Sequence, residues 1–184
     1  KQISMMITTR NNGFGNTIYI QIPRIKVVIP LFILFRALGI LTDKEICEKI
    51  LLDIENSKLK KMLYALRACI VEANEYMTQE DALNFIIQHA MFTPINMDKE
   101  AGIKKKREFT QEVLNNDLFP HCHDKKQRIY FLGYMTNKLL QCSFGWINPD
   151  DRDSYNNKRV DLTGTLLNNL FRNYFNKLVK DMQK

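Results

Sequence analysis

The sequence lacks several features that would assign it to a class of proteins at once. Its seven glycines form no phosphate-cradling loop, its four cysteines include no Cys-x-x-Cys pair, and it contains no internal repeat or low-complexity linker. The longest apolar run, VVIPLFILF at residues 27–35, is broken by Pro30 and is shorter than the roughly 20 residues that span a bilayer. We therefore expect neither a membrane partner nor a zinc site built from paired cysteines.

The composition is that of an ordinary globular protein. Hydrophobic residues make up 45% of the 184 positions and charged residues 26%, which suits one domain, or one domain with parts of a neighbour. The net charge of +7 fits a polyanionic partner, although solubility alone explains it equally well. Cys47, Cys69 and Cys142 fall in apolar helical patterns, which indicates reduced, packed thiols and a reducing intracellular compartment.

The order of apolar residues predicts a mainly helical fold of the α+β class with a small N-terminal β-hairpin. Two β-prone runs within residues 4–22 surround a segment rich in asparagine and glycine, which is typical of a hairpin. A short extended piece follows between Pro23 and Pro30. Helical periodicity then predicts helices over about 43–54, from near 57, from near 78, within 99–119 and 125–142, and from about 163.

Particular residues support parts of this fold. Thr42 and Glu45 form a capping box, in which each side chain accepts a hydrogen bond from the other residue's backbone amide. Gly133 lies inside a helical pattern, where it indicates close packing against another helix. The basic run at residues 104–107 is typical of the solvated face of a helix, with Ile103 and Phe109 on its apolar face.

We expect the chain to be part of a longer protein. It begins at Lys1 rather than Met, and the apolar period of its last helix is still running at the C-terminus without Gly or Pro. One domain would leave that apolar stripe partly uncovered, which favours self-association. The stripe consists of Leu166, Leu167, Leu170, Phe171, Tyr174, Leu178 and Val179.

Two polar clusters are candidate sites. The HCHD motif at residues 121–124 places its side chains in different directions, which fits a polar loop better than a metal site. Asp150, Asp151 and Asp153 offer oxygen ligands for Mg²⁺, but the chain has no companion nucleophile or base. A structural role, in which these aspartates accept backbone amides or pair with the cations nearby, fits the segment better.

Three segments together resemble the second-largest subunit of multisubunit DNA-dependent RNA polymerases, particularly the eukaryotic and large-DNA-virus versions. They are IPLFILFRALGILTDKEI at residues 29–46, YFLGYMTNKLLQC at residues 130–142 and DDRDSYNNKRVDLTGTLLNNLF at residues 150–171. The resemblance runs over residues 17–184 and corresponds to the region called the lobe, with the adjoining edges of the protrusion. Its most specific part is DDRD followed by KR-x-DL, a variant of the pattern DDxDHxGNRR of bacterial β subunits.

The resemblance implies one wall of the DNA cleft, with no catalytic residue in this segment. It implies a hairpin at the edge of the protrusion in residues 1–22, the lobe in residues 23–162, and a helix that returns to the protrusion in residues 163–184. Nucleic acid near the transcription bubble is then contacted by the loop at residues 149–162, through Arg152, Asp153, Lys158 and Arg159. In that loop Asn156 replaces a common glycine, and we expect a left-handed turn to persist there because asparagine tolerates positive φ.

The implied partners are DNA, the largest polymerase subunit and the other polymerase subunits. The segment itself is expected to bind no cofactor, whereas the complete enzyme, a nucleotidyltransferase, uses Mg²⁺. The implied location is the nucleus, or the cytoplasmic viral factory or virion for a viral enzyme. Two alternatives stay open: a stand-alone basic helical module that binds nucleic acid or protein, and a metal-dependent phosphodiesterase that uses the aspartate cluster.

Overall fold

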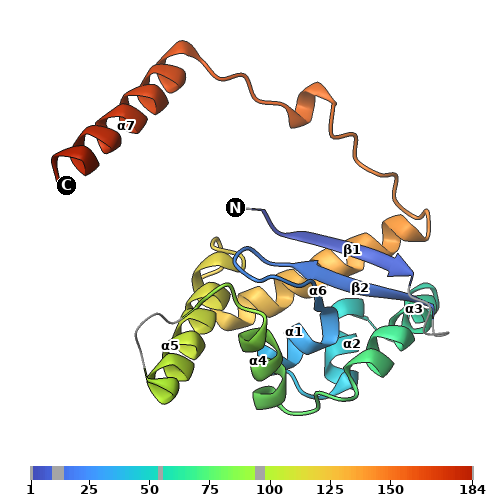
Figure 1. The fold of residues 1–184 in the computed structure, drawn as a ribbon. Coiled ribbons are helices and arrows are strands. Elements are labelled where there is room, and N and C mark those ends of the chain that lie inside the picture. The colour runs from blue at the N-terminus through green and yellow to red at the C-terminus, as the bar shows by residue number, and fades with distance from the viewer. Residues whose placement is uncertain (1, 10–14, 54–55, 94–97, 184) are drawn as a thin grey trace. The chain divides into compact units, whose positions relative to one another are not determined.

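The computed structural model describes residues 2–9, 15–53, 56–93 and 98–183. The chain divides into two compact units, Lys1–Ile147 and Asn148–Lys184. The first unit contains a small sheet and most of the helices (Figure 1), which confirms the predicted mainly helical fold with strands at the N-terminus. Its elements are β1 (Ser4–Thr9), β2 (Asn16–Gln21), β3 (Ile29–Pro30), α1 (Leu31–Ala37), α2 (Asp43–Leu51), α3 (Ser57–Ala73), α4 (Gln79–Gln88), α5 (Lys99–Glu112), the π-helix η1 (Val113–Asp117) and α6 (Lys125–Ser143).

The predicted hairpin is confirmed. β1 and β2 pair antiparallel, from Ser4 opposite Gln21 to Thr9 opposite Asn16, and the short β3 adds to the other edge of β2. Of the residues predicted to lie between the two strands, Asn11, Asn12 and Gly13 lie outside the described residues, whereas Gly15 adopts a φ of 98°. Both faces of β2 are covered, and on one of them the Tyr19 hydroxyl donates a 2.5 Å hydrogen bond to Glu72 of α3.

The segment between Pro23 and Pro30 is only partly extended. Arg24 adopts a φ of 66°, which turns the chain, and Ile25 then forms an isolated bridge with Ala90. The strand resumes only at β3, whose last residue directly precedes α1. The prediction of one continuous extended piece was therefore too simple, because it did not anticipate the turn at Arg24.

α1 is buried along its whole length, and this includes the charged residue Arg36. Its Nη1 atom donates to the carbonyl oxygens of Ala73 and Tyr76 at 2.5 and 2.9 Å, and its Nη2 atom donates to Asp43 at 2.6 Å. The two carbonyls lie at and just beyond the C-terminal end of α3, where helical carbonyls have no partner within the helix. Arg36 thus joins α1 to the end of α3 and the start of α2.

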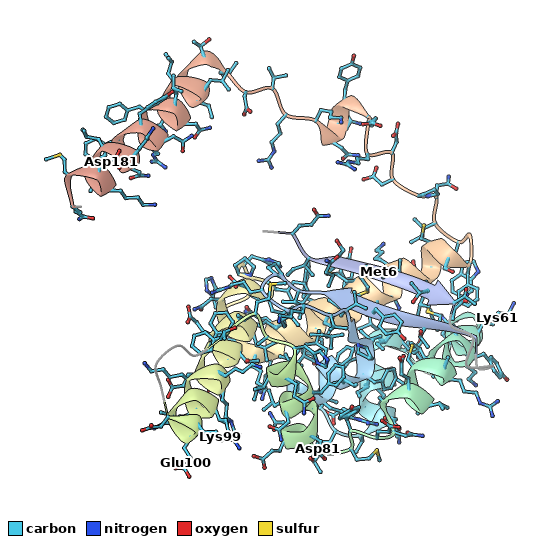
Figure 2. The ribbon with its side chains drawn as sticks, in the orientation of Figure 1. Met6, Lys61, Asp81, Lys99, Glu100 and Asp181 are labelled. Carbon is cyan, nitrogen blue, oxygen red and sulfur yellow. The ribbon has the colours of Figure 1, made fainter. Side chains whose placement is uncertain are left out.

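The predicted helix starts at α2 and α4 are confirmed by their caps. The Thr42 hydroxyl accepts from the Glu45 amide at 3.4 Å, and the Thr78 hydroxyl accepts from the amide of Asp81, labelled in Figure 2, at 3.1 Å. α2 ends at Leu51 because Leu52 adopts a φ of 64°. The end that we predicted, near residue 54, lies outside the described residues.

Close packing at Gly133, as predicted, brings α6 against α2. A Cβ atom built at Gly133 would overlap the backbone carbonyl of Lys49, so the two helices approach closely only because this side chain is absent. The prediction for Ile103 was wrong: this residue of α5 is 60% exposed. The apolar contact of α5 is instead made by Phe109, whose ring lies 5.1 Å from the Arg24 guanidinium and stacks on Phe92.

Side chains fill the space between the hairpin and the helices of the first unit, whereas Lys99 and Glu100, at the start of α5, are exposed (Figure 2). All four cysteines are free thiols, and Cys47 and Cys69 belong to this core. The Cys69 sulfur also accepts from the Ile18 amide at 3.3 Å. Burial raises the pKa of each of these two thiols from 9.0 to about 11.

Candidate nucleic-acid interface

The second unit begins with the loop at residues 149–162, which contains the 3-10 helix η2 (Tyr155–Asn157). The loop is closed on itself by Asn157, whose side-chain amide donates to the Asp150 carboxylate at 3.0 Å and to the Asp151 carbonyl at 2.7 Å. The Ser154 amide donates to the same Asp151 carbonyl at 3.2 Å. A chain of polar residues therefore holds a defined turn with no buried apolar side chain beneath it.

Each aspartate of the cluster has a partner inside the loop. Asp150 accepts from Asn157, Asp151 accepts from the Asp153 amide at 2.9 Å, and Asp153 accepts from the Lys158 ammonium at 2.8 Å. These are the structural contacts that the sequence analysis favoured for the cluster. Among the described residues no three His, Cys, Asp or Glu side chains converge as metal ligands would.

The basic side chains of the loop are open to solvent. Lys158 is 50% exposed and pairs with Asp153, which is 83% exposed, so the pair is worth at most about 1 kcal/mol and is screened by salt. Arg152 and Arg159 are exposed and have no hydrogen bond or ion pair with any residue that the structure describes. The loop thus presents two uncommitted guanidinium groups and one ammonium that is easily released.

Asn156 does not adopt the left-handed conformation that we predicted. It is the central residue of η2, and the described non-glycine residues with positive φ are Arg24, Leu52 and Phe119. The reason is local: η2 is a right-handed turn, and the following residue, Asn157, fixes it by bonding back to the aspartates. Asn157 was missed as the residue that closes the turn, although asparagine is favoured in turns because its side chain can hydrogen-bond nearby backbone groups.

The HCHD motif lies in the first unit, between η1 and α6, and its side chains do not converge. The His121 ring packs edge-on against Phe131 at a centroid distance of 4.5 Å, and Cys122 is buried. His123 uses its backbone amide to donate to Gln127 of α6 at 3.1 Å. The motif is a connecting loop that packs against α6, as its alternating directions indicated.

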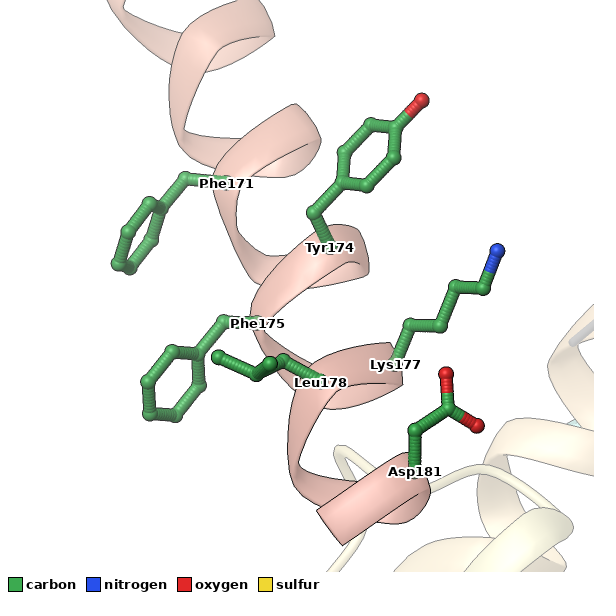
Figure 3. A pocket seen from close by; sticks show the side chains of 6 residues that line it. All are labelled: Phe171, Tyr174, Phe175, Lys177, Leu178 and Asp181. Carbon is green, nitrogen blue, oxygen red and sulfur yellow. The ribbon is translucent and has the colours of Figure 1, made fainter.

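The second unit continues with α7 (Thr163–Met182), whose apolar stripe is uncovered. Leu166, Leu170 and Phe171 are each more than half exposed, and the rings of Phe171 and Phe175 stack on each other at 5.7 Å. Figure 3 shows side chains of this helix that line a hollow: Phe171 and Phe175 project to one side of the helix, and Tyr174, Lys177 and Asp181 project to the other. No helix in the described part of the chain is long and apolar enough to cross a membrane.

Comparison with known protein sequences assigns the chain to a family. The profile of the family described as "RNA polymerase Rpb2, domain 2" matches residues 3–161. DNA-directed RNA polymerase II subunit RPB2 of Schizosaccharomyces pombe is 33% identical over 100% of the chain and 15% of its own length. DNA-directed RNA polymerase subunit 2 of Acanthamoeba polyphaga mimivirus is 33% identical over 92% of the chain and 15% of its own length.

A plant relative has the same relationship: DNA-directed RNA polymerase II subunit 2 of Arabidopsis thaliana is 34% identical over 96% of the chain and 14% of its own length. All these relatives are second subunits of DNA-directed RNA polymerases. This is the class of protein that the sequence was found to resemble. The chain belongs to the RNA polymerase Rpb2 domain 2 family. It spans about one seventh of the length of the curated relatives that it matches.

Proposed function

We propose that the chain is the lobe of the second-largest subunit of a DNA-dependent RNA polymerase and forms one wall of its DNA cleft. In this proposal the lobe is residues 23–162, while residues 1–22 lie at the edge of the protrusion and residues 163–184 return to it. The exposed apolar stripe of α7 supports packing of this helix against a neighbouring domain, since most of the stability of a helix comes from burying its apolar face.

The loop at residues 149–162 is the nucleic-acid contact in this proposal. Lys158 and Arg159 bind backbone phosphates, Arg152 adds a third cation, and Asp153 holds Lys158 in place until phosphate replaces it. Phosphate contacts of this kind position a strand without reading its sequence. The observation that carries the proposal is the pair of exposed arginines without a partner among the described residues, on a loop of a polymerase family.

Catalysis belongs to the complete enzyme. We assign no catalytic residue and no Mg²⁺ ligand to this chain, whose aspartates are engaged with one another's backbone and with Asn157 and Lys158. The partners are then DNA, the largest subunit and the other subunits of a nucleotidyltransferase assembly. Its location is the nucleus, or the viral factory or virion if the enzyme is viral.

The test is the salt dependence of DNA binding by the assembled polymerase. Replacing Lys158→Glu and Arg159→Glu together removes two phosphate contacts, and each contact contributes about 0.9 to the slope of log K against log salt. We expect the slope to fall by about 2 and binding to weaken most at low salt. A matched control replaces Lys104→Glu and Lys105→Glu, two exposed lysines of α5, with the same change of charge. Equal slopes for both double variants would refute the loop's role.

A further inference from the structure

Arg128 of α6 is a buried cation without a counter-ion. The residue is 9% exposed, and its Nη2 atom donates to the Asn115 backbone carbonyl at 2.7 Å while Nη1 donates only a long 3.4 Å hydrogen bond to the Asn115 side-chain oxygen. Its Nε atom is buried without a partner, and no carboxylate of the described residues pairs with it. A buried guanidinium in this state is unfavourable, so the site is short of one negative charge.

The space beside Arg128 is suited to an anionic group. Arg128 lines a cavity of about 190 Å³ together with Lys125, Gln79, Gln111 and Asn115, and no Asp or Glu is among its lining residues. The remaining walls are apolar side chains of α4, η1 and the end of α1. The volume is below the roughly 300–1,000 Å³ of sites that hold whole small molecules. One carboxylate or phosphate group fits, whereas a complete cofactor does not.

A second hollow, of about 550 Å³, adjoins the first, and Leu38 and Lys125 line both. The Lys125 ammonium lies 2.9 Å from the position that a Cβ would take at Gly39, which lines the second hollow. The second hollow combines apolar and aromatic surface with lysines: the Lys49 ammonium lies 4.7 Å from the centre of the Tyr130 ring, and Lys126 also lines the hollow. Its one carboxylate is Glu45.

This pairing of surfaces favours a peptide over a nucleic acid. A nucleic-acid backbone needs a row of solvent-exposed cations, whereas here Arg128 is 9% exposed and the hollow beside it has room for a single anionic group. The adjoining surface of Leu38, Ile40 and Ile129 fits an apolar side chain. We propose that these two hollows bind an acidic peptide segment of a partner protein, with one Glu or Asp carboxylate on Arg128 and Lys125 and an apolar neighbour beside Tyr130. The proposal concerns the first unit alone and does not rest on the proposed function.

The test measures fluorescence anisotropy of a labelled ten-residue peptide of alternating glutamate and leucine, titrated with the complete 184-residue chain. We expect saturable binding that is lost when glutamine replaces every glutamate of the peptide. Arg128→Met should weaken it at least about tenfold, since the substitution removes the hydrogen bonds that the guanidinium donates to the peptide carboxylate. Lys125→Gln, an exposed change that folding tolerates, should weaken binding about two- to fivefold, and the control Lys104→Gln should leave it unchanged.

Thermal unfolding of Arg128→Met gives an independent readout, because removal of an uncompensated buried charge should not lower the midpoint substantially. If that variant unfolds, the proposal is tested by comparing the peptide affinity of Lys125→Gln with that of Lys104→Gln. Absence of saturable peptide binding, or equal weakening by Lys125→Gln and Lys104→Gln, would overturn the proposal. So would inorganic phosphate or a ten-nucleotide single strand that binds in place of the peptide with the same dependence on Lys125, since the occupant would then be a phosphate.

Discussion

Phe35 in α1 and Phe171 in α7 occupy similar apolar stretches of helix, yet Phe35 is 0% exposed and Phe171 is 66% exposed. The charged residues differ in the same way: Arg36 is buried with three hydrogen bonds, while Arg159 is exposed and has no partner among the described residues. The first unit uses its apolar and charged groups to build its own core. The second presents the same types of group outward, which is the arrangement expected of surfaces that meet other molecules.

The largest contrast should come from removing the two phenylalanine rings in turn. Phe35→Ala leaves a cavity in a closed core and should lower the free energy of unfolding of the first unit by about 3–5 kcal/mol. Phe171→Ala removes an exposed ring and should change it by less than about 0.5 kcal/mol. Urea unfolding followed by far-UV circular dichroism measures the free energy of unfolding of both variants. Similar losses for the two variants would mean that α7 is part of the cooperative core, contrary to the difference in exposure between Phe35 and Phe171.

Two glycines allow the packing of the two units to be compared at the backbone. Gly133→Ala forces a methyl group against the Lys49 carbonyl and should destabilise the first unit by about 1–3 kcal/mol, because neither helix backbone can yield easily. Gly164→Ala in α7 meets nothing within 4 Å and serves as the control. We expect its unfolding curve for the first unit to coincide with that of the unsubstituted chain. A tolerated Gly133→Ala would show that α2 and α6 are packed less closely than described.

The smallest effect is confined to alkaline pH and concerns a buried thiol. Burial raises the pKa of Cys47 to about 11, so the folded state keeps its proton over a range in which the unfolded thiol, with its pKa of 9.0, has ionised. Its contribution to stability is complete below about pH 9 and is lost as the pH rises through about 11. The stability of the unsubstituted chain should therefore fall more steeply over that window than that of Cys47→Ala. Parallel curves would contradict the raised pKa.

Local signals in the sequence predicted the fold where local interactions determine it. The caps at Thr42 and Thr78 and the glycine at residue 133 act through neighbouring residues or through a missing side chain, and the structure confirms each. Arg36 could not be placed in this way. An arginine that closes an apolar run looks like a surface residue until the end of α3 supplies carbonyls from positions 73 and 76.

In the loop at residues 149–162, too, local signals predicted some contacts but not the conformation of every residue. Its composition indicated that the aspartates would be engaged within the loop, and the contacts of Asp151 and Asp153 confirm that. The conformation predicted for Asn156 was wrong. It depends on which of the two adjacent asparagines hydrogen-bonds to Asp150 and Asp151, and the sequence alone does not distinguish Asn156 from Asn157. Which molecule Arg152 and Arg159 contact stays a prediction, since a surface contact is determined by the partner as much as by the chain.

The proposed function rests on contact between the loop at residues 149–162 and nucleic acid in the assembled polymerase. Photo-crosslinking tests it most directly, with a benzophenone amino acid in place of Arg159 in the complete enzyme bound to DNA with an open bubble. With DNA bound, we expect crosslinks from this position to DNA. Crosslinks from position 159 to another polypeptide only, unchanged by DNA, would contradict it.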